Sequence, residues 1–154
     1  MNIWTGIILG AVALGVYGFS RLSHAGNKIV TEVKGRIHSI DFQNLTFAID
    51  AKIKNPSQTQ LSLTYPFIKI SYKDKIIASS ELKNISLKIE PMSEANINNI
   101  KIPVSFLRLG GVGIDFLKKV TDKSVKITLQ IETSTYILVA GGKIPYSKTE
   151  DITV

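Results

Sequence analysis

The stretch Ala51–Tyr72 reads "AKIKNPSQTQLSLTYPFIKISY", and the pattern on either side of its Asn55-Pro56 pair decides the fold. Apolar residues alternate with polar ones over Leu45–Ile53 and again over Leu61–Tyr65. This period of two is typical of a strand with one buried and one solvated face. Proline lacks the N–H that a strand ladder needs, and an asparagine side chain can bond nearby backbone groups. We therefore interpret Asn55 and Pro56 as a corner between two strands and not as a binding or catalytic site.

The same alternation recurs along most of the remaining chain, between turn-forming residues such as Pro91-Met92-Ser93 and Gly141-Gly142. It predicts further strands over Ile29–Ile40, Ile68–Tyr72, Ile85–Ile89, Ile100–Phe106, Val125–Ile131 and Tyr136–Tyr146. Many short strands separated by turns indicate an all-β sandwich.

One segment departs from this period. Residues 110–123, "GGVGIDFLKKVTDK", place Ile114, Leu117 and Val120 at helical spacing, with Asp115 early and two lysines late. That order of charges complements the helix dipole, so we expect a helix here. The predicted fold class is an immunoglobulin- or fibronectin-like β-sandwich of seven to eight strands with one short helix.

The first twenty residues, Met1–Ser20, contain no Asp, Glu, Lys, Arg or His. As a helix they reach about 30 Å, the thickness of a hydrocarbon core, with Trp4 and Tyr17 near the two interfaces. We predict a single transmembrane helix over 1–20, a linker over 21–27 and the sandwich domain over 28–154. A cleaved signal peptide is the competing interpretation, but the basic residues that should open such a peptide are missing.

Basic residues follow the apolar segment and none precedes it, and the positive-inside rule then predicts that the domain lies on the cytoplasmic side. Small residues stand four apart within the segment, Gly6 with Gly10 and Ala11 with Gly15. Such faces let membrane helices approach closely, so these four residues are candidates for helix packing. A homo-oligomer or another protein partner is therefore expected.

Several features of the domain share an order with one known family. The chain has Asn55-Pro56 at a strand end, Tyr72 before a short turn, Ile102-Pro103-Val104 in a later strand, and Ile144-Pro145 near the end. Over residues 28–154 this order resembles the late-embryogenesis-abundant group 2 family, also called the water-stress and hypersensitive-response (WHy) domain, with Asn55 and Pro56 as the family-marker turn. The resemblance implies a seven-stranded sandwich plus a helix, no catalytic residues, and links to stress protection, membrane association and apolar ligands.

Residue types that carry chemistry are few. The chain has no cysteine and two histidines, His24 and His38, which are too few for a histidine-rich metal centre. Ser80–Lys83 fits S-x-x-K but is set among strands, and Gly110–Gly113 lacks the lysine of a P-loop. We expect no catalytic residues, no cofactor, no metal and no identified small-molecule substrate.

The net charge of +7 leaves two kinds of partner to weigh. The lysines follow the polar faces of strands, and no RNA-binding aromatic motif or helix-turn-helix accompanies them, so we expect a lipid bilayer as partner and no nucleic acid. Solubility alone is an equally simple explanation of the charge. Sixteen lysines against three arginines, with 23 isoleucines, are typical of an AT-rich genome and favour a bacterial or viral source.

Together these features predict a non-enzymatic, single-pass membrane protein that has a structural or binding role at a membrane surface. The membrane is that of a bacterial cell or of a virion. One alternative is a structural membrane protein of a membrane-containing virus particle, which links bilayer and protein shell. The other is a lipid or apolar-ligand carrier with a cavity between its sheets.

Overall fold

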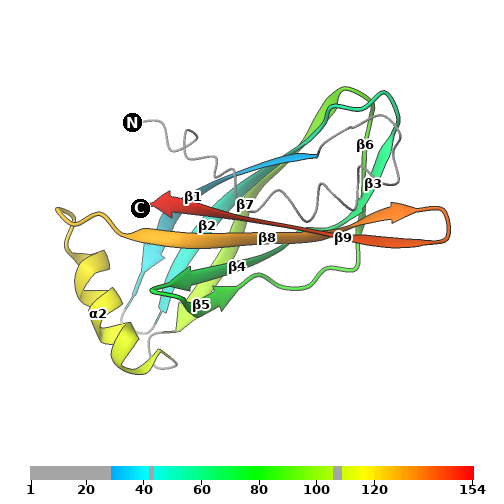
Figure 1. Ribbon diagram of the computed structural model, residues 1–154. Coiled ribbons are helices and arrows are strands. Elements are labelled where there is room, and N and C mark those ends of the chain that lie inside the picture. The colour runs from blue at the N-terminus through cyan, green and yellow to red at the C-terminus, as the bar shows by residue number, and fades with distance from the viewer. Residues whose placement is uncertain (1–28, 42–43, 106–108) are drawn as a thin grey trace.

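The computed structural model describes residues 29–41, 44–105 and 109–154, which form an all-β domain with one short helix (Figure 1). One sheet has three strands in the order β1-β2-β7, and the other runs β5-β4-β8-β3-β6 with β9 paired to β8. The two sheets pack face to face as a β-sandwich. The elements are β1 Val30–Ile40, β2 Asn44–Asn55, β3 Leu61–Thr64, β4 Phe67–Tyr72, β5 Lys75–Ser79, β6 Ser86–Ile89, β7 Ser93–Ser105, α2 Gly110–Thr121, β8 Thr128–Val139 and β9 Gly142–Thr153.

The expected number of strands, seven to eight, is wrong, because the described residues form nine. The strand predicted over Tyr136–Tyr146 is a hairpin, in which β8 ends at Val139 and β9 begins at Gly142. Gly141 has a φ of 86°, a conformation that glycine adopts without steric cost and that closes this two-residue turn. The last strand, β9, thus starts at Gly142 and not at Tyr136, where the alternation placed its start.

The helix predicted from its spacing is present as α2, and it covers one end of the sandwich (Figure 1). Lys118 and Lys119 lie in its last turn as expected, but its first turn holds no acidic residue. Asp115 lies in the middle of the helix and bonds the β4–β5 hairpin instead. Phe116, on the inner side, packs against Tyr72 at 5.1 Å and Phe47 at 6.2 Å between ring centroids.

The hydrophobic core is divided into two clusters. The larger cluster lies toward α2 and includes Phe47, Ile70, Phe116 and Leu129. The smaller cluster lies toward the opposite end and includes Ile29, Ile53, Leu61, Leu63, Ile89 and Ile137. Side chains from both sheets therefore fill the space between them.

Within residues 29–41, 44–105 and 109–154, no helix is long and apolar enough to cross a membrane. The segment 1–20, the linker 21–27 and the predicted packing residues Gly6, Gly10, Ala11 and Gly15 lie outside the described residues.

Candidate functional site

A band of polar side chains crosses the interior between the two hydrophobic clusters. Along each of the neighbouring strands β1, β8 and β9, the inward residues change from one cluster to polar residues and then to the other cluster. All of these polar residues are buried, with at most 6% of their surface exposed. We call this set the polar belt; its members are Thr31, Thr133, Thr135, Tyr146, Lys148 and Glu150.

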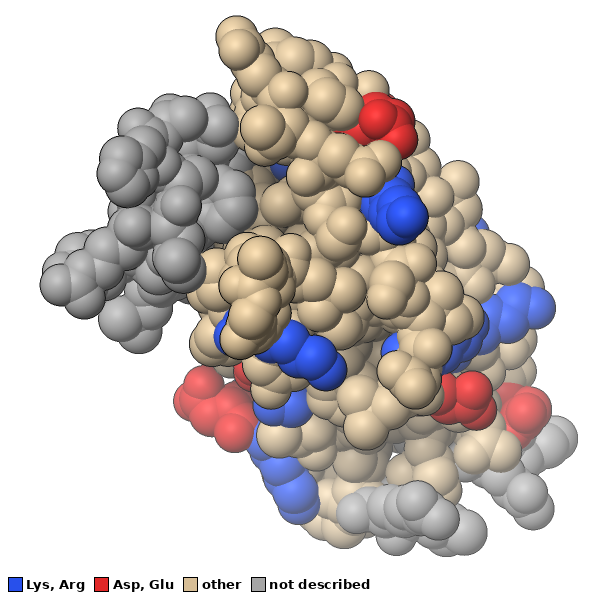
Figure 2. All heavy atoms as spheres, turned by 90° about the vertical axis from the view of Figure 1, so that its right-hand side faces the viewer, with Lys and Arg blue, Asp and Glu red and all other residues tan. Residues whose placement is uncertain are grey.

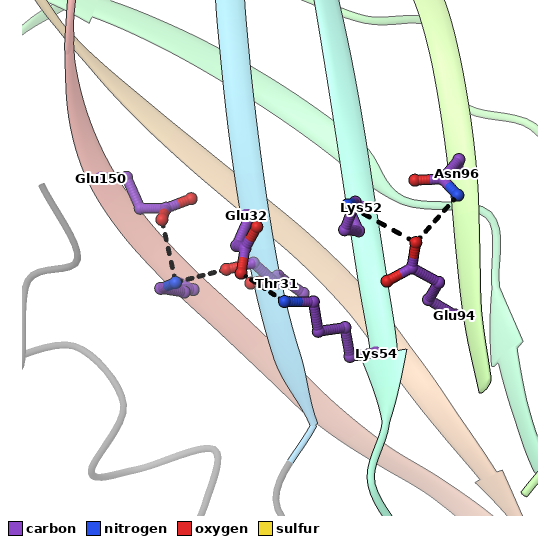
Figure 3. Close-up of polar contacts among 8 residues, drawn as sticks. Thr31, Glu32, Lys52, Lys54, Glu94, Asn96 and Glu150 are labelled. Carbon is purple, nitrogen blue, oxygen red and sulfur yellow. Dashed lines mark hydrogen bonds and ion pairs between the residues drawn. The ribbon is translucent and has the colours of Figure 1, made fainter. Parts of the chain in front are cut away.

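The belt is centred on a buried ion pair on β9. Lys148 Nζ lies 2.9 Å from Glu150 Oε1 and also donates to the backbone carbonyl of Thr31 on β1 (Figure 3). The backbone N–H of Val33, also on β1, donates to the Glu150 carboxylate. Both ions thus bond the backbone of β1, although β1 pairs as a strand only with β2 in the described part of the chain. We call this connection the β1–β9 stitch.

The stitch sits where two sheet edges meet. Unpaired N–H and C=O groups on an edge strand invite pairing with other chains, and inward-pointing charges are one way in which natural proteins prevent this. Here Lys148 and Glu150 occupy backbone groups of β1 that have no strand partner. The arrangement therefore closes one side of the sandwich with side chains in place of a ladder.

Hydroxyl groups complete the belt. Tyr146 Oη and Thr31 Oγ1 are 3.0 Å apart, and Thr135 Oγ1 donates to the carbonyl of Thr64 at 2.6 Å. Burial raises the pKa of Tyr146, and burial is also the main reason that the pKa of Glu150 is raised, against the opposing hydrogen bond from Lys148. Thr133 Oγ1, opposite Lys148 in the β8–β9 register, has no hydrogen-bond partner among the described residues.

Charges on the outer face of the three-stranded sheet are paired across strands. Lys54 and Glu32 are 2.8 Å apart, and Lys52 and Glu94 are 3.5 Å apart (Figure 3). The hydrogen bond from Lys54 to Glu32 raises the pKa of Lys54, and the one from Asn96 is the main cause of the lowered pKa of Glu94. Part of the basic excess is therefore used in ordinary cross-strand pairs.

Asn55 and Pro56 form the corner that ends β2. Asn55 is 2% exposed, and its amide nitrogen donates to the carbonyls of Thr59, Ile89 and Glu90 at 2.8, 3.0 and 3.1 Å. Its Oδ1 accepts the N–H of Ser57 at 3.1 Å. The residue joins the β2–β3 corner to the turn between β6 and β7, and Pro56 is exposed beside it.

A second polar cluster fixes α2 to the β4–β5 hairpin. Asp115 Oδ2 accepts hydrogen bonds of 2.8 Å from Lys73 Nζ and from the hydroxyl of Tyr72. The bond from Lys73, followed by that from Tyr72, lowers the pKa of Asp115 to about 2. Unlike the stitch, this cluster is open to solvent, because the Lys73 and Asp115 side chains are 58% and 41% exposed.

The remaining sequence motifs have structural explanations. Ser80 follows β5 in a segment without helix, and its Oγ accepts the N–H of Ile68 at 2.9 Å. Gly110, with a φ of 57°, opens α2 as the expected turn into the helix. His38 is exposed, and the described residues hold no group of three metal-ligating side chains. Ser80 and Gly110 therefore have structural roles in the fold.

The polar belt is the feature that the sequence interpretation missed. Tyr146, Lys148, Glu150 and Ile152 share one parity on β9, so the two charges stand between an aromatic and an aliphatic residue. That parity places the two charges on the buried face. Ending the last strand at Tyr146 hid this signal.

No protein-family model matches the chain, and no curated protein matches it in sequence. Among solved structures, a protein from Archaeoglobus fulgidus is similar with a TM-score of 0.54 and 11% identity, over 79% of this chain and 93% of that one. A protein from Arabidopsis thaliana is similar with a TM-score of 0.48 and 11% identity, over 79% of this chain and 78% of that one. The first likeness supports the fold alone.

Proposed function

We propose that this chain is a non-enzymatic membrane protein, anchored by one helix over Met1–Ser20, which presents its β-sandwich at the bilayer surface in a structural or binding role. The domain lies on the cytoplasmic side. We also propose that the sandwich is of the immunoglobulin or fibronectin type and is related to the late-embryogenesis-abundant group 2 (WHy) family, with Asn55 and Pro56 as its marker turn.

The observation that carries the proposal is the double attachment of β1, the strand that directly follows the apolar segment and its linker. β1 pairs with β2 over ten residue pairs. Its other edge is held by Lys148 and Glu150, and Ile29 just before it is 4% exposed. In a domain that is connected to the anchor through its first strand, any force on the anchor acts on that strand. Here β1 is held on both edges, by β2 on one side and by Lys148 and Glu150 on the other.

The buried groups support a role without catalysis. Lys148 and Glu150 bond each other and the backbone of β1, and Asn55 bonds four backbone groups. A nucleophile or general base needs contact with a substrate. These groups are instead engaged in holding strands together.

Membrane fractionation of cells that produce the full chain tests the anchor. We expect the chain in the membrane pellet, resistant to alkaline carbonate and released by detergent. Leu9→Lys together with Leu14→Lys is the matched variant, because two charges at the centre of a spanning helix oppose insertion. A wild-type chain that carbonate extracts would overturn the proposal.

Protease treatment of sealed vesicles tests the orientation. In vesicles that expose the cytoplasmic face, we expect digestion of the domain from Lys28 onward. In vesicles of the opposite orientation the domain should be protected. The reverse result would contradict the cytoplasmic assignment while leaving the anchor in place.

A groove on the outer face of the six-stranded sheet favours a second candidate function, the binding of an anionic amphiphile. The groove has a volume of ≈ 460 Å³, and no carboxylate is among its described lining residues, which include Tyr65, Phe67, Lys69, Leu82, Lys83, Tyr136 and Pro145. If this candidate is correct, lipid should co-purify with the full chain in mild detergent and be lost in Tyr136→Ser. Tyr136 is 49% exposed, so this change should leave folding intact.

A further inference from the structure

We propose that one defined end of the sandwich contacts the bilayer. This end, which we call the turn end, consists of the corner 55–60, the turn 90–92 and the hairpin tip 139–142. The inference rests on the proposed function, because it presupposes the N-terminal anchor. It adds which surface meets the membrane and how the domain is oriented on it.

The position of the first strand places the turn end near the anchor. Val30, the first residue of β1, is paired with Lys54, the second-last residue of β2. The chain therefore enters the domain beside the corner, at the right-hand end of Figure 1. Since Ser20 and Ile29 are nine residues apart, the chain between them spans at most about 30 Å.

The opposite end is much farther from the point of entry. β1 contains 11 residues and runs from the turn end toward the end that α2 covers. At about 3.3 Å per residue the strand separates the two ends by about 36 Å. An upright domain therefore presents the turn end to lipid and holds α2 away from it.

Two exposed apolar side chains stand at the tips of the turn end. Met92 is 72% exposed in the turn before β7, and Val139 is 37% exposed beside the hairpin turn. Met92 also has a φ of 55°, a conformation that asparagine or glycine usually occupies. Contact of the Met92 side chain with the apolar part of a bilayer would explain why an exposed methionine occupies this position.

The charges around these tips are compatible with an anionic surface. Glu94 and Glu32 are paired with lysines, and Glu90 accepts a hydrogen bond of 2.7 Å from Gln60. Lys88 and Lys143 are exposed and make no ion pair with a described carboxylate. Figure 2 faces this end and shows mostly uncharged surface with scattered basic and acidic side chains.

Because the chain has no cysteine, single labels can test the orientation in the full-length protein. The chain is reconstituted in phosphatidylcholine–phosphatidylglycerol vesicles with an environment-sensitive fluorophore at one introduced cysteine. Met92→Cys and Val139→Cys report on the turn end, Ser124→Cys on the α2 end, and Ser147→Cys on the outer face of the six-stranded sheet. Lipids with a quencher on the headgroup then measure the proximity of each label, after the melting temperature of each variant has been matched to that of the parent.

We expect several-fold stronger quenching at positions 92 and 139 than at 124 and 147. Equal quenching at all four positions, or strongest quenching at 147 as in a domain lying on its side, would overturn the inference. Vesicle flotation of the same samples separates the two proposals. A chain that does not float contradicts the anchor, whereas a chain that floats without the quenching difference contradicts only the assignment of the turn end.

Discussion

Two lysine–carboxylate pairs of nearly equal length hold the sandwich together at different places. Lys148 and Glu150 are 2.9 Å apart with side chains 3% and 8% exposed, whereas Lys73 and Asp115 are 2.8 Å apart with side chains 58% and 41% exposed. The first pair closes the seam between β1 and β9, and the second fixes α2 over the end of the core. Contact distance alone does not distinguish them.

Burial makes these two pairs different interactions. The exposed pair keeps most of its hydration, so its attraction is screened and its net effect is small. The buried ions have lost their hydration, so each one depends on the other and on the backbone of β1. The pKa values differ accordingly: burial raises the pKa of Glu150, and hydrogen bonds led by that from Lys73 lower the pKa of Asp115.

The largest expected effect is that of breaking the buried pair from one side. Glu150→Leu removes the hydrogen-bond acceptor of the buried Lys148 ammonium altogether, whereas a protonated Glu150 still accepts that bond. The substitution should lower the free energy of unfolding by about 3–5 kcal/mol. Urea unfolding of the purified chain, followed by circular dichroism, measures this change. The double variant Lys148→Met with Glu150→Leu should recover most of the loss, because it removes both charges. A single variant as stable as the parent would show that the pair is not desolvated.

Asn55→Ala should have the next largest effect. It removes the donor to three backbone carbonyls and the acceptor for Ser57 N–H in a buried corner, which should cost about 2–3 kcal/mol. Asn84→Ala, at an exposed position in a loop, is the matched control and should change stability little. An Asn55 variant that keeps its urea midpoint but loses membrane or partner binding would contradict the architectural role.

The two regions also differ in how well the sequence predicts them. The helix spacing of Ile114, Leu117 and Val120 located α2, because a change of period is a local signal. The hydrogen bond from the Tyr72 hydroxyl to Asp115 joins residues 43 positions apart, so spacing within the helix could not reveal it. The same holds for the stitch, which joins Lys148 to a carbonyl 117 positions away.

Within β9 the sequence did contain a signal, namely two charges at the parity of buried residues. The two charges can be recognised as buried only when the bounds of β9 are known, and these depend on the turn at Gly141. The corner at Asn55 was predictable as a turn from local chemistry. Its bonds to Ile89 and Glu90 depend on how the two sheets are assembled, and local chemistry does not specify that.

A pH titration should give the two carboxylates opposite signs. The pKa of Asp115 is about 2 in the folded chain against an ordinary 3.8, so its contribution to stability is present above about pH 4 and is lost as the pH falls through 2. The pKa of Glu150 is raised, so its ionisation opposes folding and this penalty decreases as the pH falls through its folded pKa.

Melting temperatures between pH 2 and pH 7 measure these signs. The difference between the parent and Asp115→Asn should shrink toward low pH, because the parent loses its advantage there. For Glu150→Gln the opposite is expected. As the pH falls and Glu150 is protonated, the melting temperature of the parent should rise relative to that of the variant. If the melting temperatures of the parent and both variants changed with pH in parallel, the opposite effects assigned to Asp115 and Glu150 would be contradicted.

The smallest expected effect is that of Lys73→Ser, which breaks the exposed pair from one side. Asp115 remains hydrated, keeps the Tyr72 hydroxyl as donor and lies 3.6 Å from Lys119 Nζ, so we expect the melting temperature to fall by no more than about 2 °C. Added salt should reduce even this difference, because it screens charges that solvent reaches. Lys143→Ser, which removes an exposed lysine without a described ion pair, is the control. If Lys73→Ser destabilised the chain as strongly as Glu150→Leu, burial would not be what separates the two pairs, and the role assigned to the stitch would lose its physical basis.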